Sequence, residues 1–327
     1  NRVGRPSPVV QPDPRTIAVA VNPEIDAITV GIVGLGGTMV QRVRHALPRP
    51  PTVAEAVSIA AQVIDELRAE LGGSHRCVGI GLALPGLVRA RDGLVRLAPH
   101  LGWSDEPVAE MLAAATGYPV VAANDASLGA NAERVFGAGR GVSDLVYLNG
   151  GASGIGGGII AGGRLLGGVE GYAGEFGHTL VTGRQTQDAT GSAGSLELEV
   201  NRSALLTAVG LSSADPDELE SALVSSDSPN VSAEVHRQLG FLGVALRNAI
   251  DILNPELIVL GGFLGSLLAV DSNFLEGIAQ RQSLAASYES VRIVRAQLGS
   301  NILMIGAAEL AFTRLLADPA MTLDALQ

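Results

Sequence analysis

The chain has 327 residues, of which 47% are hydrophobic, enough to bury a full core and to form two domains. Its net charge of −11 excludes the basic face that binding DNA phosphates would require, so any DNA contact would fall to another segment. All 22 basic residues are arginines, which excludes a lysine-based phosphate site, and the single cysteine, Cys77, excludes a disulfide framework and indicates a reducing, cytoplasmic location.

The first predicted elements begin a mixed sheet. Residues 1–15 contain four prolines and no apolar periodicity, which predicts an extended linker. Apolar runs at 17–21 and 27–35 predict two strands joined by a turn around Asn22-Pro23-Glu24. The folded part of the chain is therefore expected to open with an antiparallel hairpin.

The rest of the first half continues an α/β pattern. Thr52 and Glu55 form a capping box for a helix over 52–71, and Gly72 marks the end of this helix. The remaining predicted elements of this half are a strand at 77–86, a helix at 106–117 and a strand at 119–125.

The second half is predicted to repeat this plan, with paired strands first and helices after. Its predicted strands are at 144–151, 154–163, 256–262 and 291–298, and its predicted helices are at 201–208, 215–224, 232–253 and 301–317. We find no signal peptide and no uninterrupted apolar run long enough to cross a bilayer. Two similar halves fit a duplicated architecture with a cleft between lobes.

Asn124 and Asp125 end one predicted strand with an amide and a carboxylate. The carboxylate can accept a proton from a hydroxyl group while the amide orients it. Either residue also suits the N-cap of the helix that comes next, and the two roles are compatible. Strand ends of this kind line ligand clefts in α/β proteins.

Glu175 and His178 form a second polar pair, three residues apart and preceded by glycines. A carboxylate and an imidazole at this spacing can converge on neighbouring hydroxyl groups of a sugar. The pair closes a segment, residues 150–178, that has more than ten glycines around two predicted strands.

This segment resembles the part of the ROK family (repressor, open reading frame, kinase) that runs from a phosphate-contacting glycine turn to a Gly-Glu-x-Gly-His motif. Further resemblances lie at 82–88, 98–103, 254–262 and 301–311. The resemblance implies an α/β, two-lobed, actin-like (ribonuclease H-like) sugar-kinase fold that binds the sugar in an interlobe cleft.

The family pattern also implies where the lobes lie. The N-terminal lobe is expected over 16–123, closed by the helix at 301–318, and the C-terminal lobe over 124–300. In ROK repressors a Gly-Arg-Pro segment, resembled by residues 3–10, comes after a winged helix-turn-helix. A DNA-binding domain is thus expected before residue 1.

Carried over position by position, the resemblance implies sugar ligands at Asn124, Asp125, Glu175, His178 and Glu197, with Asp125 also at the position of the kinase base. Ser153, Gly154 and Gly156 correspond to the phosphate turn, here expected to be vestigial. His100 departs from the family pattern, because family members often have Asn at this position, where the side chain contacts a sugar hydroxyl.

The metal site departs from the family pattern. Zinc sites of the family use three cysteines and the histidine of the Gly-His motif. Here the three cysteine positions are Asp188, Thr190 and Ser195. We therefore expect no zinc, no other metal and no cofactor, with hydrogen bonds and packing holding this loop.

The phosphate motif Asp-x-Gly-Gly-Thr departs as well, because the first strand turn has Ala20-Val21-Asn22-Pro23-Glu24. Residues 34–38 imitate the motif after the second strand, but with Gly in place of Asp, and we interpret them as a turn. These losses predict that the chain is not an enzyme, although an enzymatic function remains as the alternative.

The leading expectation is a kinase-inactive, sugar-sensing effector and dimerisation domain of a ROK transcriptional regulator, a repressor. An ATP-dependent hexose kinase, favoured by Asp125 and the glycine turn, is the alternative, and a scaffold without ligand is a third. The expected partners are a sugar or sugar derivative, operator DNA through the N-terminal domain, and a second copy in a homodimer or dimer of dimers, with no membrane.

Overall fold

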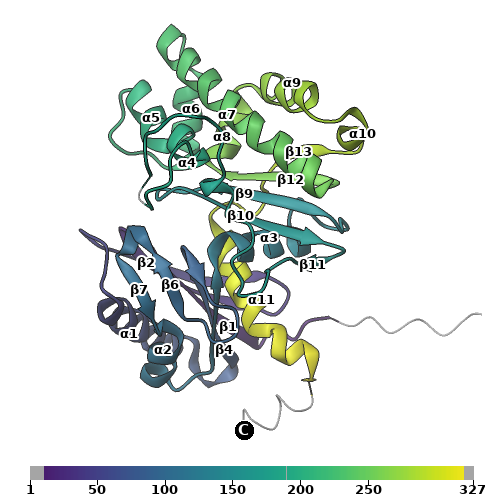
Figure 1. The fold of residues 1–327 in the computed structure, drawn as a ribbon. Coiled ribbons are helices and arrows are strands. Elements are labelled where there is room, and N and C mark those ends of the chain that lie inside the picture. Colours follow the sequence, from purple (N-terminus) through teal and green to yellow (C-terminus); the bar gives the residue numbers. More distant parts are fainter. Residues whose placement is uncertain (1–10, 189, 320–327) are drawn as a thin grey trace, which may run out of the picture.

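The structure, a computed structural model, describes residues 11–188 and 190–319. Its backbone forms two lobes, drawn one above the other in Figure 1, and each lobe contains a five-stranded sheet. The expected α/β, two-lobed, actin-like architecture is confirmed. Residues 3–10, which contain the Gly-Arg-Pro segment, lie outside the described residues.

The two large sheets have the same topology, two antiparallel pairings and then two parallel ones. The lower sheet has the order β3 (Thr38–Ala46), β2 (Ala27–Gly34), β1 (Thr16–Pro23), β4 (Arg76–Leu84) and β8 (Val120–Asn124). The upper sheet has the order β11 (Arg164–Leu165), β10 (Ile155–Ala161), β9 (Leu145–Gly150), β12 (Leu257–Gly262) and β13 (Arg292–Arg295).

A small third sheet extends the lower lobe. It consists of β5 (Leu87–Val88), β6 (Val95–Ala98) and β7 (Trp103–Glu106). Its buried side chains, among them Trp103, belong to the same core as those of β1 and β4. The Trp103 indole N–H donates a hydrogen bond to the Pro51 carbonyl at 2.9 Å, so the ring is both buried and satisfied.

Helices cover these sheets and join the lobes. The lower lobe has α1 (Val53–Leu71) and α2 (Val108–Thr116), and α3 (Asp125–Phe136) and α11 (Ile302–Ala317) pack against each other. The upper lobe has α4 (Leu196–Glu199), α5 (Arg202–Ala208), α6 (Pro216–Val224), α7 (Pro229–Leu253), α8 (Phe263–Val270), α9 (Ser272–Gln282) and α10 (Ala285–Tyr288). Short 3₁₀ helices lie at Gly72–Ser74, Pro99–Leu101, Phe176–His178 and Gly299–Asn301.

Helix α3 links the two large sheets, because it begins where β8 ends and packs against β9 and β10. The packing is close: a Cβ at Gly158 of β10 would lie 2.6 Å from the Cβ of Ala130 in α3. Near the other end of α3, the buried carboxylate of Glu133 accepts hydrogen bonds from the backbone N–H groups of Ala138, Gln297 and Leu298. The start of α3 is therefore held at a fixed point between the lobes.

Most predicted elements are present, including the Thr52–Glu55 capping box. The strand expected at 291–298 instead ends at Arg295, because the N–H groups of Gln297 and Leu298 bond to Glu133 and not to the sheet. The helix expected from 106 begins at Val108, since Glu106 belongs to β7.

Several elements are absent from the sequence-based prediction, among them β3, α8 and α9. β3 lies at the sheet edge, where polar side chains mask its alternation. α8 is apolar on almost every side and so has no helical periodicity, and α9 begins after a single intervening residue.

One helical segment among the described residues, Gly299–Ala317, is long and apolar enough to cross a membrane by length and composition alone. The sequence contains no uninterrupted apolar run of this length, and Glu309 and Arg314 do interrupt this one. In the fold this segment contains α11, which packs against β1, β4 and α3, and half of its most apolar window is buried. We interpret it as a core helix, because its apolar side chains already contact protein.

Candidate functional site

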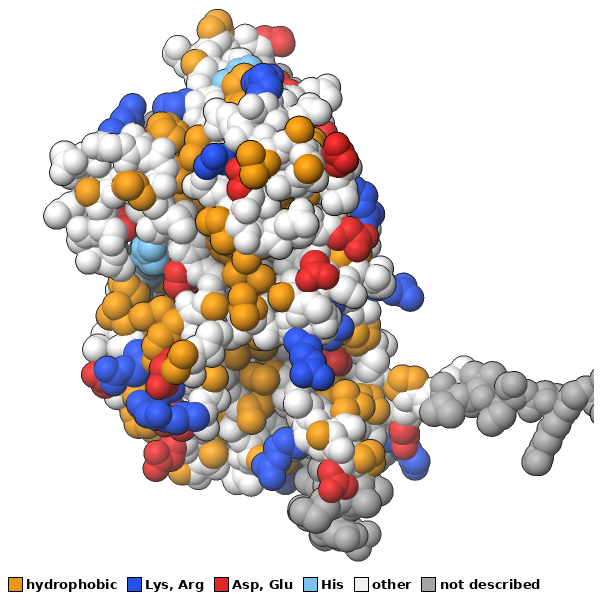
Figure 2. Space-filling view, turned by 45° about the vertical axis from the view of Figure 1, so that its right-hand side comes forward, with side chains coloured by type: hydrophobic (Ala, Val, Ile, Leu, Met, Phe, Trp, Pro, Cys, Tyr) orange, Lys and Arg blue, Asp and Glu red, His pale blue; other side chains and the backbone are white. Residues whose placement is uncertain are grey.

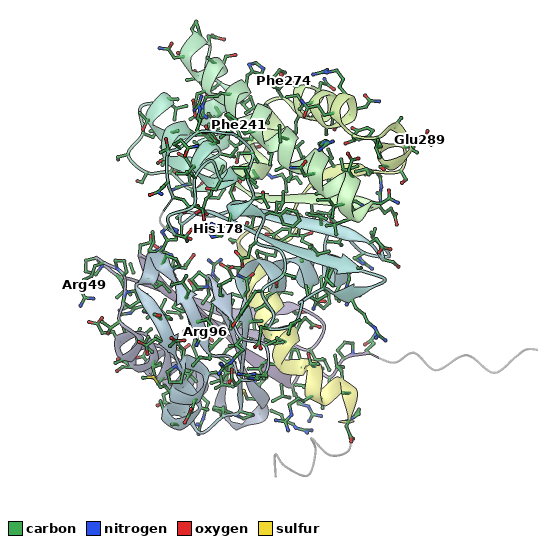
Figure 3. All side chains as sticks on the ribbon, in the orientation of Figure 1. Arg49, Arg96, His178, Phe241, Phe274 and Glu289 are labelled. Atoms are coloured by element: carbon green, nitrogen blue, oxygen red, sulfur yellow. The ribbon has the colours of Figure 1, made fainter. Side chains whose placement is uncertain are left out.

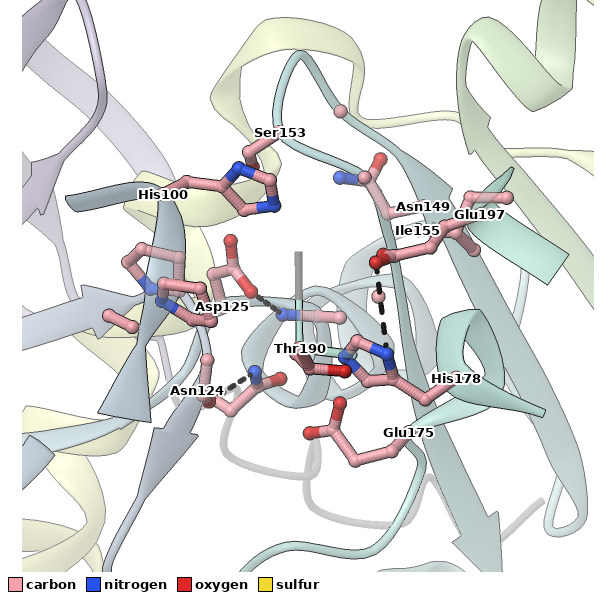
Figure 4. Close-up of a pocket in the computed structure, with 18 residues that line it drawn as sticks. His100, Asn124, Asp125, Asn149, Ser153, Ile155, Glu175, His178, Thr190 and Glu197 are labelled. Carbon is pink, nitrogen blue, oxygen red and sulfur yellow. Dashed lines mark hydrogen bonds and ion pairs between the residues drawn. The ribbon is translucent and has the colours of Figure 1, made fainter. Parts of the chain in front are cut away.

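A polar pocket lies between the two lobes, and Figure 4 shows the side chains that line it. The lower lobe contributes Pro85, Gly86, Ala98, Pro99 and His100 to its wall. All eight residues that the sequence assigns to sugar or phosphate binding line the same pocket: Asn124, Asp125, Ser153, Gly154, Gly156, Glu175, His178 and Glu197. His178 lies at the waist of the molecule in Figure 3.

Asn124 and Asp125 enter the pocket from the junction of β8 and α3. The Asn124 side chain accepts a hydrogen bond from the Ser127 N–H at 3.0 Å and donates one to the Gly86 carbonyl at 3.0 Å. The N-cap interpretation of Asn124 is thus confirmed. One oxygen of Asp125 accepts the Ala126 N–H at 2.7 Å, and the carboxylate faces the pocket beside it.

The environment of the pocket alters its carboxylates. The pKa of Asp125 is raised to about 7, chiefly by burial and also by the nearby Glu175 carboxylate, although a hydrogen bond from the Ala126 N–H lowers it. Burial also raises the pKa of Glu175, while His178 lowers it. A carboxylate with a pKa near neutrality is suited to accept a proton from a hydroxyl group.

Glu175, His178 and Glu197 line the pocket from the upper lobe. Glu175 precedes the 3₁₀ helix that contains His178, and Glu197 lies in α4. The Nδ1 atom of His178 is 3.7 Å from Glu197 Oε1. Together with Asp125, these side chains place several hydrogen-bond acceptors around one small space, as a polyhydroxylated ligand requires.

The glycine turn between β9 and β10 forms the part of the wall nearest Glu197. The turn is closed by a hydrogen bond from the Gly151 N–H to the Gly154 carbonyl at 2.9 Å. A Cβ at Gly154 would lie 2.5 Å from a Glu197 oxygen, so a side chain there would displace this carboxylate.

The loop at 180–195, which carries the positions of the family's zinc ligands, is built around Asp188. This carboxylate, 2% exposed, accepts hydrogen bonds from the N–H and hydroxyl of Thr190 and from the Ser192 N–H. Burial alone would raise the pKa of Asp188, but the hydrogen bonds from Thr190 and Ser192 hold it well below its usual range. The Nδ1 atom of His178 lies 3.3 Å from the same carboxylate.

The base of this loop is tied to α7 through charged and aromatic contacts. Arg184 of the loop and Arg237 of α7 both contact the buried carboxylate of Glu199, at 3.2 and 2.8 Å. Both guanidinium groups also lie over the Phe241 ring. The loop is therefore anchored to the upper core by a buried charge and an aromatic ring.

The first strand turn contains no phosphate motif. Asn22 is buried and its amide donates to the Ala83 carbonyl at 2.9 Å, linking β1 to β4. Residues 34–38 form a turn between β2 and β3, closed by a bond from the Gly37 N–H to the Gly34 carbonyl. The interpretation of these residues as a turn is confirmed.

A second cavity, of about 470 Å³, lies between the lobes and shares Asn149 with the first pocket. Its charged lining residues are Glu24, Arg42, Asp215, Asp217 and Arg295. Both arginines already have partners, Ser300 for Arg42 and Glu220 for Arg295. Sequence reasoning does not identify Asn149, Arg42 or Arg295, since no motif distinguishes them.

Residues 19–314 match the model of the ROK family. The chain is 29% identical over 263 residues to a xylose repressor of Caldicellulosiruptor bescii, covering 74% of this chain and 64% of that protein. It is 28% identical over 304 residues to a glucokinase of Streptomyces coelicolor, covering 87% of this chain and 94% of the glucokinase.

A solved structure of a ROK family glucokinase from Streptomyces griseus, in complex with glucose and AMPPNP, is also similar. Its TM-score is 0.76 at 26% identity, and the match covers 90% of this chain and 98% of that one. These glucokinases contradict the expectation that the chain is not an enzyme, and the departure at the first strand turn is no proof of inactivity. With nine-tenths of its length inside the family match, the chain belongs to the ROK family.

Proposed function

We propose that the chain binds a sugar in the interlobe pocket and serves as the sugar-sensing domain of a transcriptional regulator. The observation that carries the proposal is the convergence of Asp125, Glu175, His178 and Glu197 on one pocket from both sides of the cleft. Each group can accept a hydrogen bond from a hydroxyl, and a sugar presents hydroxyls in several directions.

The charge of the pocket narrows the ligand class. Three carboxylates line it beside two histidines, and no arginine or lysine does so among the described residues. An anionic ligand such as a sugar phosphate would meet like charges at short range. A neutral sugar or an amino sugar fits this electrostatic environment, because its hydroxyls or ammonium group donate hydrogen bonds.

A role in transcriptional regulation is supported by the similarity to a xylose repressor. The chain covers 64% of the length of that repressor. In such a protein the chain would act as a homodimer and reach operator DNA through a further domain. On the face drawn in Figure 2, arginine and acidic side chains are interspersed, without a continuous basic patch. We therefore propose that this face does not contact DNA directly.

Sugar phosphorylation is a second candidate, and two observations favour it. The glucokinase match covers more of its relative's length than the repressor match does. The raised pKa of Asp125, about 7, suits a base that takes a hydroxyl proton. The second cavity, with Arg42, Arg295 and the glycines at 261–262, would hold a nucleotide, which would supply the phosphoryl group.

The first prediction concerns sugar binding. Isothermal titration calorimetry with a panel of hexoses, pentoses and amino sugars should find a ligand. Asp125→Asn or Glu175→Gln should weaken it about 10- to 100-fold, since a hydrogen bond to a charged group contributes about 1.5–3 kcal/mol. Glu110→Gln, on the exposed face of α2, is the matched control and should bind normally. The absence of binding across the panel would contradict the proposed function.

The second prediction concerns pH. Because the folded-state pKa of Asp125, about 7, exceeds its ordinary value of 3.8, the folded protein keeps a proton that the unfolded chain loses. The free energy of unfolding should therefore fall as pH rises from about 4 to about 7, by at most about 4 kcal/mol from this group. Sugar affinity should instead rise with pH, because the carboxylate is the acceptor.

Urea unfolding from pH 4 to pH 8, with calorimetry at pH 6 and pH 8, measures both effects. The Asp125→Asn variant lacks this titration, so its stability relative to the wild type should increase across the window. A difference between variant and wild type that does not change with pH would rule out the assigned titration.

The third prediction separates phosphorylation from sensing. If the chain is a sugar kinase, ADP release from ATP and Mg²⁺ should depend on the sugar found by calorimetry. Asp125→Asn should then lower kcat about 100-fold or more, the usual contribution of a general base. A coupled assay of ADP measures this rate. Sugar binding without sugar-dependent ADP release would eliminate the kinase candidate and leave sensing.

We also propose that the loop at 180–195 is held without zinc. His178, Asp188 and Glu197 do bring possible ligating atoms within 4.8 Å of one another. However, these are one imidazole and two carboxylates, where the structural zinc sites of proteins rely on cysteines. In addition, the hydrogen bonds from Thr190 and Ser192 already use much of the acceptor capacity of the Asp188 carboxylate.

The fourth prediction tests the zinc-free loop. Elemental analysis of the purified protein should find zinc far below one atom per chain, and EDTA should leave the melting temperature unchanged. Asp188→Ala should destabilise the protein by about 1–3 kcal/mol, because backbone N–H groups lose their acceptor. Stoichiometric zinc that EDTA removes with a loss of stability would refute this assignment.

A further inference from the structure

The segment between β11 and the 3₁₀ helix at Phe176–His178 leaves the upper sheet and touches the lower lobe. We call residues 166–174 the strap. The Ala90 N–H, in the turn between β5 and β6, donates a hydrogen bond to the Glu170 carbonyl at 2.9 Å. Arg91 of the same turn lies 3.7 Å from the Glu170 carboxylate. These contacts join the two lobes beside the pocket.

Gly171 fits closely against the lower lobe. Its φ angle is +96°, a conformation that favours glycine. A Cβ on this residue would lie 3.0 Å from the Ala90 Cβ and 3.1 Å from the Val88 carbonyl oxygen. Val88 belongs to the buried lower core, so its backbone has little freedom to withdraw.

The other end of the strap is fixed to the upper sheet. A Cβ at Gly174 would lie 2.6 Å from the Gly157 carbonyl oxygen of β10, and the Gly174 carbonyl accepts the Phe176 N–H at 2.7 Å. Glu175 comes immediately after. Among the described residues no hydrogen bond to the Glu175 carboxylate is found, so the backbone on either side sets its position.

We propose that Glu170 and Gly171 are positioning residues, which dock the strap on the lower lobe and thereby place Glu175 in the sugar pocket. The proposal rests on the proposed sugar binding. The Arg91–Glu170 ion pair is exposed and contributes little. The Ala90–Glu170 backbone bond and the close fit of Gly171 therefore carry the docking.

Docking across the lobes has a kinetic consequence. A sugar in the pocket contacts groups from both lobes, and the docked strap holds those lobes together at the edge of the same pocket. Undocking the strap would let a bound sugar leave more readily, while the encounter with the open pocket would change less. The strap should therefore act mainly on the dissociation rate.

The fifth prediction compares two glycine substitutions. Gly171→Ala combines a positive φ with a clash against the lower lobe, whereas the control Gly163→Ala has a φ of +75° and no atom within 4 Å of the added Cβ. Calorimetry and stopped-flow with the best sugar of the panel should show about tenfold weaker binding for Gly171→Ala, mostly through faster dissociation. Gly163→Ala should bind like the wild type.

A measurement without sugar keeps the test independent of the proposed function. Amide hydrogen exchange should show faster exchange at Ala90 in Gly171→Ala than in Gly163→Ala, because the Ala90 N–H loses its acceptor.

If Gly171→Ala fails to fold, Ala90→Val crowds the same contact from the lower lobe. If the amide at position 90 keeps its wild-type protection in both Gly171→Ala and Ala90→Val, the docking is overturned. Faster exchange with unaltered sugar affinity overturns the positioning role. A wild type that binds no sugar contradicts the proposed function.

Discussion

The seating of α3 between the two large sheets is the constraint on which the rest of the molecule depends. The helix begins at Asp125, packs on β9 and β10, and is held at its other end by Glu133. The fit requires Gly158, since a Cβ there would meet Ala130. Because α3 cannot shift without breaking these contacts, Asn124 and Asp125 stay at the centre of the cleft, where polar groups of both lobes converge.

The buried carboxylates of the pocket cost folding stability, a cost that ligand binding would explain. Burial raises the pKa of Asp125 and of Glu175, which means that the folded state disfavours their ionised forms. A protein selected only for stability would replace such groups with apolar side chains. Their presence in one pocket beside His178 is consistent with ligand binding, because a ligand that donates hydrogen bonds offsets the loss of water around the carboxylates.

The chain belongs to the ROK family and resembles both a xylose repressor and a glucokinase. A pocket that binds a sugar would serve both activities, and we propose that the second cavity and the strap act after the sugar has bound. A pocket built from two lobes converts occupancy into a change of lobe position, provided that the ligand binds the two arrangements with different affinity. The same closure would serve phosphorylation or signalling, so the sugar pocket alone does not select between them.

The sequence by itself determined the strands and helices with clear periodicity, the Thr52 cap, and eight of the residues that line the pocket, because these depend on local pattern and on a motif. Only the tertiary structure revealed β3, α8, the Asp188 hydrogen bonds, the second cavity and the contact of Gly171 with Ala90. Edge strands and uniformly apolar helices lack a distinctive period, and contacts between residues far apart in the chain depend on how the lobes pack. The sequence also led us to expect that the chain is not an enzyme, and its similarity to glucokinases contradicted this expectation. The expectation depended on the loss of one local motif, whereas catalysis depends on how groups are placed in three dimensions.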